Sequence, residues 1–393
     1  MLSESFTAEA PGRLIKAGEG SSAYWAFVPN PLPPQLVLDD AELWRALSDA
    51  DRALGELAGL GRSLANPELF IRPFIRREAV LSSRIEGTHT SLLDLYRYEA
   101  AVEPGARIAG PEDKDDAREV LNYVRALEHG LAMPKEEAAG QSLILAVHKV
   151  LVSGVRGDRA SPGQFRREQN WVGPRSSTLF EATYVPPPPN EMNEALARLE
   201  EYIAGGNSLP PLIRQALVHY QFEAIHPFRD GNGRVGRLLV SLLLVRWGLL
   251  PAPVLYLSAF LEARRDDYYA RLLGVSQCGE WRAWLLFFLQ GVASQSTDAV
   301  ARAKRLHDLQ ADYHRRIVKA RGSALQVRLA DILFEAPIIS GPRAAKLLDV
   351  PYTTAQRSVD RLVSLGILEQ LGEAKYGKSY CARELLNLTE PVV

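Results

Sequence analysis

The sequence predicts a mostly α-helical protein that ends in a separate helix-turn-helix unit. Helical periodicity fills most of 1–300, and strand signals are scarce outside one short segment at 165–189. A nearly all-apolar run over 235–245 is typical of a buried helix. The segment 322–393 differs, because two short helical patterns separated by a tight turn are followed by alternating strand and turn signals.

Domain boundaries are expected where proline, glycine and charged residues cluster. VPNPLPPQ, which begins at Val28, has the composition of an extended entry arm, and VEPGARIAGPEDKDD, which begins at Val102, that of a linker. The polar, basic stretch over 297–321 carries periodic leucine and isoleucine residues and predicts a connecting helix. The expected divisions are an N-terminal helical region (1–105), a core (106–296), the connecting helix (297–321) and the C-terminal unit (322–393).

The segment HPFRDGNGRVGR at 226–237 leads into the predicted buried helix. Its glycines let the backbone turn N–H groups toward a ligand, which predicts an anion site at a helix N-terminus. Asp230 is placed to hold a hard divalent cation such as Mg²⁺ against bound phosphates. Arg234 and Arg237 lie three residues apart, and each guanidinium can grip phosphate oxygens by two N–H groups. The segment therefore predicts a site for phosphate-ester transfer.

His226 is the candidate general base of this segment. It stands before Pro227, which biases the preceding residue away from helix, so its imidazole can project from a loop. An unperturbed pKa of about 6.5 suits removal of a proton from a hydroxyl group at neutral pH. The other histidines lack such neighbours in the sequence and are interpreted as structural or surface residues: His89, His129, His148, His219, His307 and His314.

A simpler explanation is a loop whose charged residues merely cap a buried helix. A short glycine-rich motif alone favours that explanation. Here eight positions are specified together, which makes accidental assembly negligible and favours the phosphate site: His226, Phe228, Asp230, Gly231, Asn232, Gly233, Arg234 and Arg237.

These residues match the core motif HxFx(D/E)GNGRxxR of the Fic family position by position. The chain resembles Fic adenylyltransferases, which mostly transfer AMP from ATP onto hydroxyl side chains of proteins. The resemblance implies a Fic-fold helical core, ATP as substrate and Mg²⁺ as cofactor. It also implies these roles: His226 as base, Phe228 as the anchor of the loop in the core, Asp230 as the Mg²⁺ ligand, Gly231, Asn232 and Gly233 as the phosphate cradle, Arg234 on the β-phosphate side and Arg237 on the γ-phosphate.

The residue at position 233 distinguishes two branches of this family. A related branch, which resembles the Doc kinases, has lysine at this position, binds its nucleotide reversed and transfers the γ-phosphate. Gly233 therefore favours transfer of AMP over phosphorylation.

A second segment, LSSRIEGTHTS at 81–91, fits the pattern (S/T)xxxE(G/N) of an inhibitory helix in Fic proteins. Ser82 and Glu86 lie four residues apart and share one helical face, and Gly87 is a good helix terminator. The resemblance implies that Glu86 reaches Arg237 and occupies space that the γ-phosphate needs. By itself the segment would be an ordinary amphipathic helix with a solvated glutamate, but its agreement with the first motif favours the inhibitory role.

A short β-hairpin is predicted over 165–189, because glycine and proline breakers flank Trp171 and Tyr184. In the family such a flap pairs with the backbone of the target protein, and a plain surface hairpin is the alternative. Weaker matches to the family extend over most of the chain, in segments that begin at Pro111, Pro162, Ala182 and Leu255.

Two neighbouring tyrosines are candidates for contact with the base of the nucleotide. Tyr268 and Tyr269 resemble the adenine-contacting tyrosines of the family. They fit equally well as core aromatics of an amphipathic helix, and both interpretations stay open.

The composition agrees with a cytoplasmic enzyme. The chain has 393 residues with 47% hydrophobic content, enough for two or three domains. Cys278 and Cys381 are too few and too far apart for a disulfide framework or a metal cluster. No apolar stretch has the pattern of a signal peptide or a membrane-spanning helix. A net charge of −1 gives no general attraction for nucleic acid or anionic membranes.

The C-terminal unit has the pattern of a winged helix-turn-helix domain. A turn at 349–351 separates one helix from a second, whose Ala355, Val359 and Leu362 share one face, and a wing-like segment follows. Residues on the exposed side of the second helix could contact DNA: Thr353, Thr354, Gln356 and Arg357. Nine Lys or Arg against eight Asp or Glu over 321–393 leave DNA binding and protein docking equally open.

Two classes of function follow from these features. The first is a protein adenylyltransferase that modifies a Ser, Thr or Tyr hydroxyl of a target or of itself and is inhibited by Glu86. The second is a DNA-binding regulator with a catalytically silent, nucleotide-sensing core; the intact His226 favours the first, because a sensor needs no base. Hydrolytic removal of AMP from a modified target is a further option. The expected partners are a target protein on the flap, DNA or a protein on the C-terminal unit, and a second copy if the chain dimerises, with no membrane contact.

Overall fold

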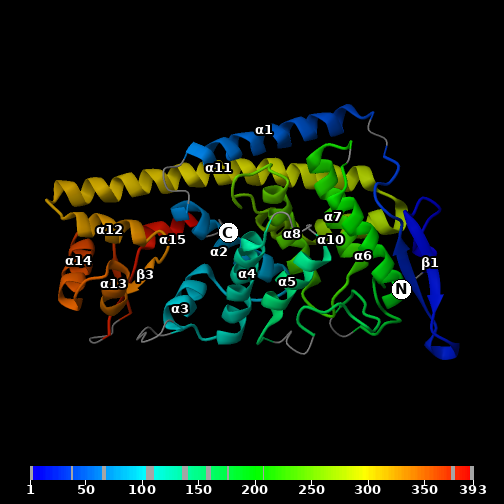
Figure 1. The fold of residues 1–393 in the computed structure, drawn as a ribbon, viewed down its shortest axis with the longest axis horizontal. Coiled ribbons are helices and arrows are strands. Elements are labelled where there is room, and N and C mark those ends of the chain that lie inside the picture. The colour runs from blue at the N-terminus through cyan, green and yellow to red at the C-terminus, as the bar shows by residue number, and fades with distance from the viewer. Residues whose placement is uncertain are drawn as a thin grey trace.

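The computed structural model describes residues 3–36, 39–63, 68–102, 110–134, 140–155, 161–174, 177–206, 208–372 and 377–389 (Figure 1). The helices are α1 (Ala41–Ser63), α2 (Glu68–Ile85), α3 (Leu92–Val102), α4 (Lys114–Ala132), α5 (Gln141–Val152), α6 (Pro189–Ala204), α7 (Pro211–Ile225), α8 (Asn232–Arg246), α9 (Ser258–Ala263), α10 (Arg265–Cys278), α11 (Trp281–Lys319), α12 (Ala324–Ile332), α13 (Gly341–Leu348), α14 (Tyr352–Ser364) and α15 (Arg383–Thr389). The strands are β1 (Gly12–Ala17), β2 (Tyr24–Pro29), β3 (Ile338–Ser340), β4 (Glu369–Leu371) and β5 (Ser379–Cys381). The prediction of a mostly helical fold is confirmed. Among the described helices, none combines the length and the apolar character needed to cross a membrane.

Helix α8 lies inside the helical body and accounts for the apolar run in the sequence. Its side chains are buried around the whole circumference, including Val235, Leu239 and Leu243. Helices α2, α4, α5 and α7 pack against it. A fully buried leucine contributes about 1.5–3 kcal/mol relative to an exposed one, so this packing fixes the position of the segment that precedes the helix.

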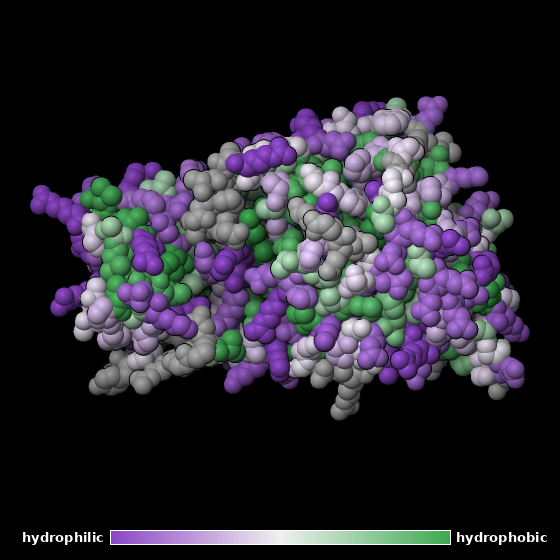
Figure 2. All heavy atoms as spheres, in the orientation of Figure 1, coloured by the Kyte–Doolittle hydropathy of each residue, from purple (hydrophilic) through white to green (hydrophobic). Residues whose placement is uncertain are grey.

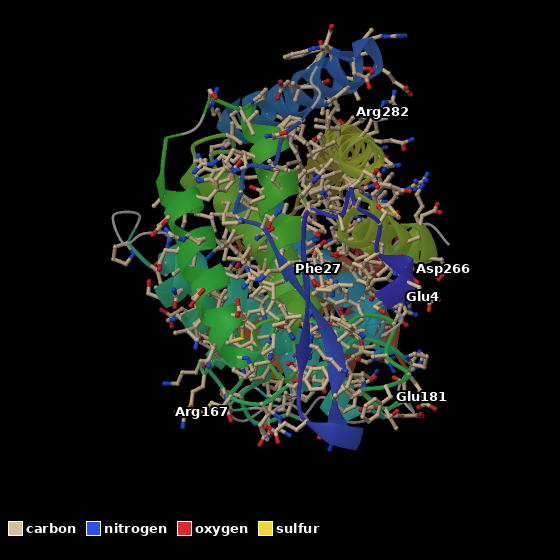
Figure 3. All side chains as sticks on the ribbon, turned by 90° about the vertical axis from the view of Figure 1, so that its right-hand side faces the viewer. Glu4, Phe27, Arg167, Glu181, Asp266 and Arg282 are labelled. Carbon is tan, nitrogen blue, oxygen red and sulfur yellow. The ribbon has the colours of Figure 1, made fainter. Side chains whose placement is uncertain are left out.

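Helix α11 is a single helix of 39 residues, and α1 lies along it (Figure 1). The connecting helix predicted over 297–321 is therefore the second part of α11, and the expected boundary before it does not interrupt the helix. The reason is that buried residues such as Val292 and Val300 keep the helical spacing on both sides of that boundary. At the start of α11, Arg282, which is labelled in Figure 3, pairs with Asp40 ahead of α1.

The N-terminal region begins with a β-hairpin that the sequence patterns do not reveal. Strands β1 and β2 pair antiparallel, with Gly12 opposite Pro29. The prediction of a helical region over 1–105 is wrong at this point, and the expected extended arm from Val28 starts inside β2. Tertiary packing holds the hairpin, since Phe27 is fully buried at the end of the molecule that Figure 3 faces.

The C-terminal unit combines helices α12, α13 and α14 with a small antiparallel sheet in the order β3-β5-β4. Helices α13 and α14 are joined by a tight turn in which Asp349 adopts a left-handed conformation with φ of 55°. The three residues predicted to share the inner face of α14, Ala355, Val359 and Leu362, are fully buried. Residues 373–376 of the expected wing lie outside the described part of the chain.

Helix α2 contacts both parts of the molecule. In its first half, Arg72 pairs with Glu335 at 3.0 Å, and α15 packs against the helix. The helix also packs against α4, α8 and α9. Residues 103–109 of the expected linker lie outside the described residues.

Candidate active site

Residues 226–231 form a tight loop between α7 and α8, and residues 232–237 are the first turns of α8. The loop begins at His226 and turns at Gly231, and both residues adopt left-handed conformations, with φ of 50° and 82°. Asn232 folds the loop on itself, since its Oδ1 accepts the N–H of Phe228 and its Nδ2 donates to the carbonyl of Phe228, both at 2.8 Å. Phe228 is fully buried and anchors the loop in the core, as expected. Asn232 therefore shapes the loop with its side chain, and only its backbone remains for a phosphate.

A pocket of about 670 Å³ opens beside this loop. Its walls come from the C-terminal end of α2, from α7, α8 and α10, and from the segment predicted to be a flap. The pocket brings together these candidates: Glu86, His226, Asp230, Gly233, Arg237, Tyr268 and Tyr269. It also includes residues that the sequence did not single out, notably Tyr220, Glu223, Arg265 and Ser276.

His226 projects into the pocket from the end of α7. Its Nδ1 lies 3.3 Å from the carbonyl oxygen of Glu223, which can only accept a hydrogen bond. Nδ1 therefore carries the proton, and Nε2 keeps its lone pair. Burial, followed by the nearby charge of Arg166, lowers the pKa of His226 to about 4. The imidazole is neutral at pH 7 and can act as a base.

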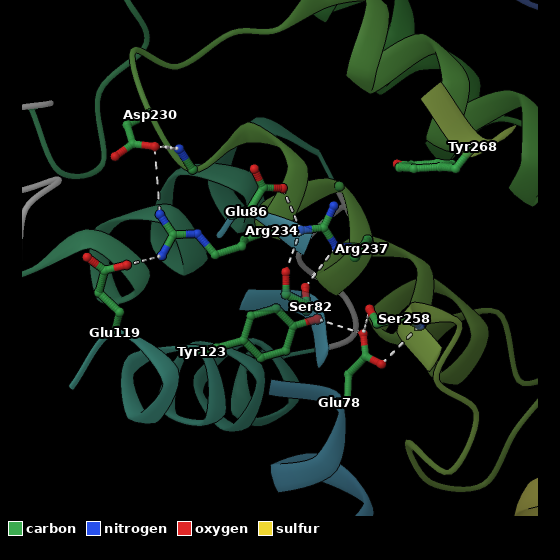
Figure 4. A network of polar contacts seen from close by, with 12 residues as sticks. Glu78, Ser82, Glu86, Glu119, Tyr123, Asp230, Arg234, Arg237, Ser258 and Tyr268 are labelled. Carbon is green, nitrogen blue, oxygen red and sulfur yellow. Dashed lines mark hydrogen bonds and ion pairs between the residues drawn. The ribbon is translucent and has the colours of Figure 1, made fainter. Parts of the chain in front are cut away.

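Arg237 is buried and held by the end of α2 (Figure 4). Its Nε donates to Ser82 Oγ at 2.8 Å, and one terminal nitrogen donates to the carbonyl of Ser82 at 2.9 Å and to Glu86 Oε1 at 2.6 Å. Burial opposes ionisation of Glu86, but attraction and hydrogen bonding from Arg237 keep its pKa below the ordinary value. The contact expected between Glu86 and Arg237 is present, and both groups are charged at pH 7.

The backbone after α2 explains why Glu86 points into the pocket. The helix ends at Ile85, and Gly87 adopts a left-handed conformation with φ of 96°, as a terminating glycine does. Glu86 comes to lie so close to Gly233 that a Cβ atom on Gly233 would overlap its Oε1. The carboxylate thus fills the space above the first turn of α8.

Arg234 is turned away from the pocket. It is buried, lies 3.3 Å from Glu119 Oε2 of α4 and 3.7 Å from Asp230 Oδ1, and is not among the described residues that line the pocket. The β-phosphate role implied for Arg234 therefore stays a prediction.

Asp230 lies at the pocket edge with its side chain about half exposed (53%), and Oδ1 accepts the N–H of Gly231 at 2.6 Å. No cluster of three metal-ligating side chains occurs among the described residues. A single carboxylate still suits Mg²⁺, which completes its shell with phosphate oxygens and water.

The two tyrosines of α10 differ in their surroundings. Tyr268 is almost fully buried, and its hydroxyl bonds with His219 Nε2 at 2.9 Å. These features agree with the interpretation of Tyr268 as a core aromatic residue. Tyr269 is 38% exposed, and both tyrosines line the pocket. His148 also lies against the motif, stacked on Phe228 with ring centroids 3.6 Å apart. His148 and His219 are both buried, in agreement with their interpretation as structural residues, and folding brings them against Phe228 and Tyr268.

The predicted flap is less regular than a hairpin. Val172 and Tyr184 form one antiparallel bridge, with N–H···O distances of 2.8 and 3.1 Å, and the structure describes no named strand within 165–174 and 177–189. Several prolines explain this, since proline cannot donate to a strand ladder. Residues 175–176 lie outside the described part of the chain. The segment is also joined to the N-terminal hairpin, because Phe27 donates its N–H to the carbonyl of Val185 at 2.9 Å.

Parts of this chain are similar to family models and to known proteins. Residues 44–132 match the Fic/DOC family N-terminal region, and residues 139–244 match the Fic/DOC family. Protein adenylyltransferase Fic from Drosophila grimshawi is 34% identical over 146 residues, which are 37% of this chain and 26% of that protein. A probable protein adenylyltransferase from Aquifex aeolicus is 27% identical over 221 residues, 55% of this chain and 62% of that protein. The chain thus spans less than two thirds of either relative.

The fold is shared with a solved structure as well. A Fic family protein from Desulfovibrio desulfuricans superposes with a TM-score of 0.58 at 20% identity, over 89% of this chain and 98% of that one. The common fold and the two family matches lead to one conclusion: this chain belongs to the Fic/DOC family.

Proposed function

We propose that the protein transfers AMP from ATP to a hydroxyl group of a target protein or of itself. The observation that carries the proposal is the placement of a neutral His226 beside the N-terminus of α8 and Arg237 in one pocket. A helix N-terminus and a guanidinium attract a phosphate chain, and a nearby base activates the attacking hydroxyl. The names of the relatives support the same activity.

In the proposed transfer, a residue of this chain takes up the proton and pyrophosphate is the leaving group. The target hydroxyl attacks the α-phosphorus of ATP, its proton passes to Nε2 of His226, and the bond to pyrophosphate breaks. Nδ1 keeps its hydrogen bond to the carbonyl of Glu223, which holds the imidazole in the required tautomer. Mg²⁺, if held by Asp230, would neutralise charge on the phosphates.

Glu86 is proposed to inhibit this reaction. Its carboxylate pairs with Arg237 and covers Gly233, so it competes with the terminal phosphate for both the guanidinium and the space. A carboxylate also repels phosphate oxygens. ATP would therefore bind weakly or in an unproductive position until the end of α2 moves.

The test is intact mass spectrometry of the full chain with Mg²⁺ and labelled ATP, in wild type and Glu86→Gly. We expect AMP incorporation to increase in Glu86→Gly, because Arg237 becomes free to bind phosphate. Glu112→Gly, an exposed glutamate in another bend, is the matched control and should behave as wild type. Incorporation in Glu86→Gly no higher than in wild type contradicts the inhibitory role, and absence of any AMP transfer contradicts the activity.

A second candidate is removal of AMP from a modified target. It is favoured by the position of Glu86, whose carboxylate is about one third exposed (34%) on the pocket wall and can orient a water molecule. The same assay distinguishes the two activities, since AMP-loaded Glu86→Gly protein mixed with wild type would then lose its label. A catalytically silent nucleotide sensor would show neither reaction.

The flap is proposed to hold the target chain. Trp171 and Phe180 are 42% and 57% exposed on this segment, and Trp171 lines the pocket. Exposed aromatic side chains at the entrance of a pocket favour contact with another protein. The backbone of a target next to Val172 would continue the single bridge of the flap.

The C-terminal unit is proposed to be a winged helix-turn-helix domain, supported by its α12-β3-α13-α14-β4-β5 order. Thr353 and Arg357 are exposed on α14, which suits DNA, whereas exposed Tyr352 and the apolar surface seen over this end in Figure 2 suit a protein. Salt-dependent binding to one DNA sequence that weakens in Arg357→Ala would favour DNA. No duplex binding at moderate salt would favour a protein partner.

A further inference from the structure

Glu223 is a pocket residue with no role in the proposed reaction. It lies on α7, one turn before His226, and its side chain lines the pocket. Its Oε1 is buried and has no hydrogen-bond partner among the described residues. The positive charge that acts on Glu223 is that of Arg237, but Arg237 forms its ion pair with Glu86.

A structural role does not account for this carboxyl group. Burying an unpartnered carboxylate is unfavourable, and burial raises the pKa of Glu223 to about 7, with Arg237 opposing the rise and Glu86 adding to it. The side chain is also closely confined, since a Cβ atom on Gly236 of α8 would overlap Oε1. A confined polar group without a partner in a pocket indicates that its partner is a ligand.

The position of Glu223 along the pocket indicates which part of a nucleotide it meets. Tyr220 and Glu223 line the pocket from α7, one interval of three residues or about 4.5 Å apart along the helix, and His226 lines it from the residue that follows the helix. His226 begins the loop that leads into α8, whose first turns carry Gly233 and Arg237 of the proposed phosphate site. Tyr220 lies farther from His226 along α7, and its hydroxyl bonds with Ser276 Oγ of α10 at 3.0 Å.

A nucleotide places its groups in the same order, from phosphates through ribose to base. With the reacting phosphate at His226, the ribose lies one interval along α7, at Glu223. Phosphate oxygens would be repelled by a carboxylate, whereas ribose hydroxyls are donors that a carboxylate accepts.

We propose that Glu223 determines specificity for ribonucleotides, by accepting hydrogen bonds from the ribose hydroxyls of the bound ATP. This inference rests on the proposed function, because it requires a nucleotide in the pocket with its phosphates on α8. The carboxylate that lacks a partner in the free protein gains one on binding. A deoxynucleotide leaves it buried and unsatisfied, which is unfavourable.

The experiment measures AMP and deoxy-AMP transfer by the full chain in the Glu86→Gly background, with ATP, 2′-deoxy-ATP and 3′-deoxy-ATP. We expect a preference for ATP of roughly 10- to 100-fold in kcat/KM over at least one deoxy analogue, from the loss of a hydrogen bond to a charged group. Added Glu223→Ala should reduce that preference to about onefold. Glu223→Gln, which keeps one acceptor oxygen, should retain part of it. Glu194→Ala, an exposed glutamate on α6, is the matched control and should leave the preference unchanged.

The outcomes separate the two proposals. If Glu86→Gly transfers AMP from ATP but uses both deoxy analogues equally well, or if Glu223→Ala keeps the preference, the ribose role is overturned. If no variant transfers AMP, the proposed function fails, and calorimetric titration of the same proteins with ATP and the deoxy analogues still tests Glu223. Should Glu223→Ala fail to fold, Glu223→Gln carries the test, and an unchanged preference in that variant counts against the proposal.

Discussion

Two glutamates line the same pocket in opposite electrostatic surroundings. Glu86, after α2, pairs with Arg237, which keeps its pKa below the ordinary value. Glu223, on α7, has a buried oxygen without a partner, and its pKa rises to about 7. The carboxylate on the α2 side of the pocket thus has a charged partner in the free protein, while the carboxyl group on the α7 side has a buried oxygen without one. The comparison teaches that Glu86 already has its partner within the protein, whereas Glu223 keeps a buried oxygen that a ligand can satisfy.

The largest effect is expected at His226, on the unsatisfied α7 side. In the Glu86→Gly background, His226→Ala should lower the transfer rate by about 10²- to 10⁴-fold, the usual contribution of a general base, with little change in ATP affinity. Mass spectrometry gives the rate and calorimetry the affinity. His129→Ala, an exposed histidine on α4, is the control. Retained AMP transfer in His226→Ala would show that His226 is not the general base.

The next effect concerns Arg237, on the satisfied side. In the Glu86→Gly background, Arg237→Ala should lower kcat/KM for ATP by roughly 10- to 100-fold, because hydrogen bonds between charged groups are worth about 1.5–3 kcal/mol. Arg198→Ala, an exposed arginine on α6, should have no effect. If Arg237→Ala leaves the gain from Glu86→Gly intact, inhibition does not act through this guanidinium.

A smaller effect is expected at Glu78, which fastens α2 to its neighbours (Figure 4). Its buried carboxylate accepts hydrogen bonds from the Tyr123 hydroxyl at 3.1 Å and from the N–H of Ser258 at 3.2 Å, and also from the Ser258 hydroxyl. Glu78→Gln turns an amide donor toward one of these donors and should reduce the free energy of unfolding by about 1–3 kcal/mol. Urea denaturation measures the loss, with Glu194→Gln as control. Equal stability would mean that the network does not hold α2.

The smallest effect is expected from pH. Pairing with Arg237 lowers the pKa of Glu86 in the folded protein. This pairing is therefore fully present above the unfolded pKa of the carboxyl group and is lost only as pH falls through the lowered value. Wild-type transfer should therefore stay low, with unchanged inhibition relative to Glu86→Gly, from about pH 6 to pH 8. A rise in the ratio of wild-type to Glu86→Gly activity within that range would mean that Glu86 titrates there.

Much of the pocket could be predicted because it is encoded by neighbouring residues. Gly231 and Gly87 adopt the left-handed conformations that glycine permits, and the apolar run after the loop forms the buried helix α8. The contact of Glu86 with Arg237 was predicted by resemblance and is present. Such features depend on short segments or on an established motif, so the sequence reveals them.

What the sequence did not reveal depends on contacts between distant segments. Arg234 faces Glu119, a residue 115 positions earlier, and no local pattern announces that pair. The β1–β2 hairpin forms where Phe27 meets the flap, and regular alternation within it is weak. One local feature of the sequence could have indicated Glu223. It is an acidic residue near the end of the mostly apolar segment before the motif, three positions ahead of His226.

Gly233 combines two properties that are usually treated separately. The absence of a side chain leaves room for the Glu86 carboxylate, and the same absence is what the resemblance associates with AMP transfer instead of phosphorylation. Even a methyl group at this position would collide with the carboxylate. A mutation of Gly233 that altered the way the nucleotide lies would therefore also displace Glu86, so the proposed transfer and its proposed inhibition cannot vary independently at this position.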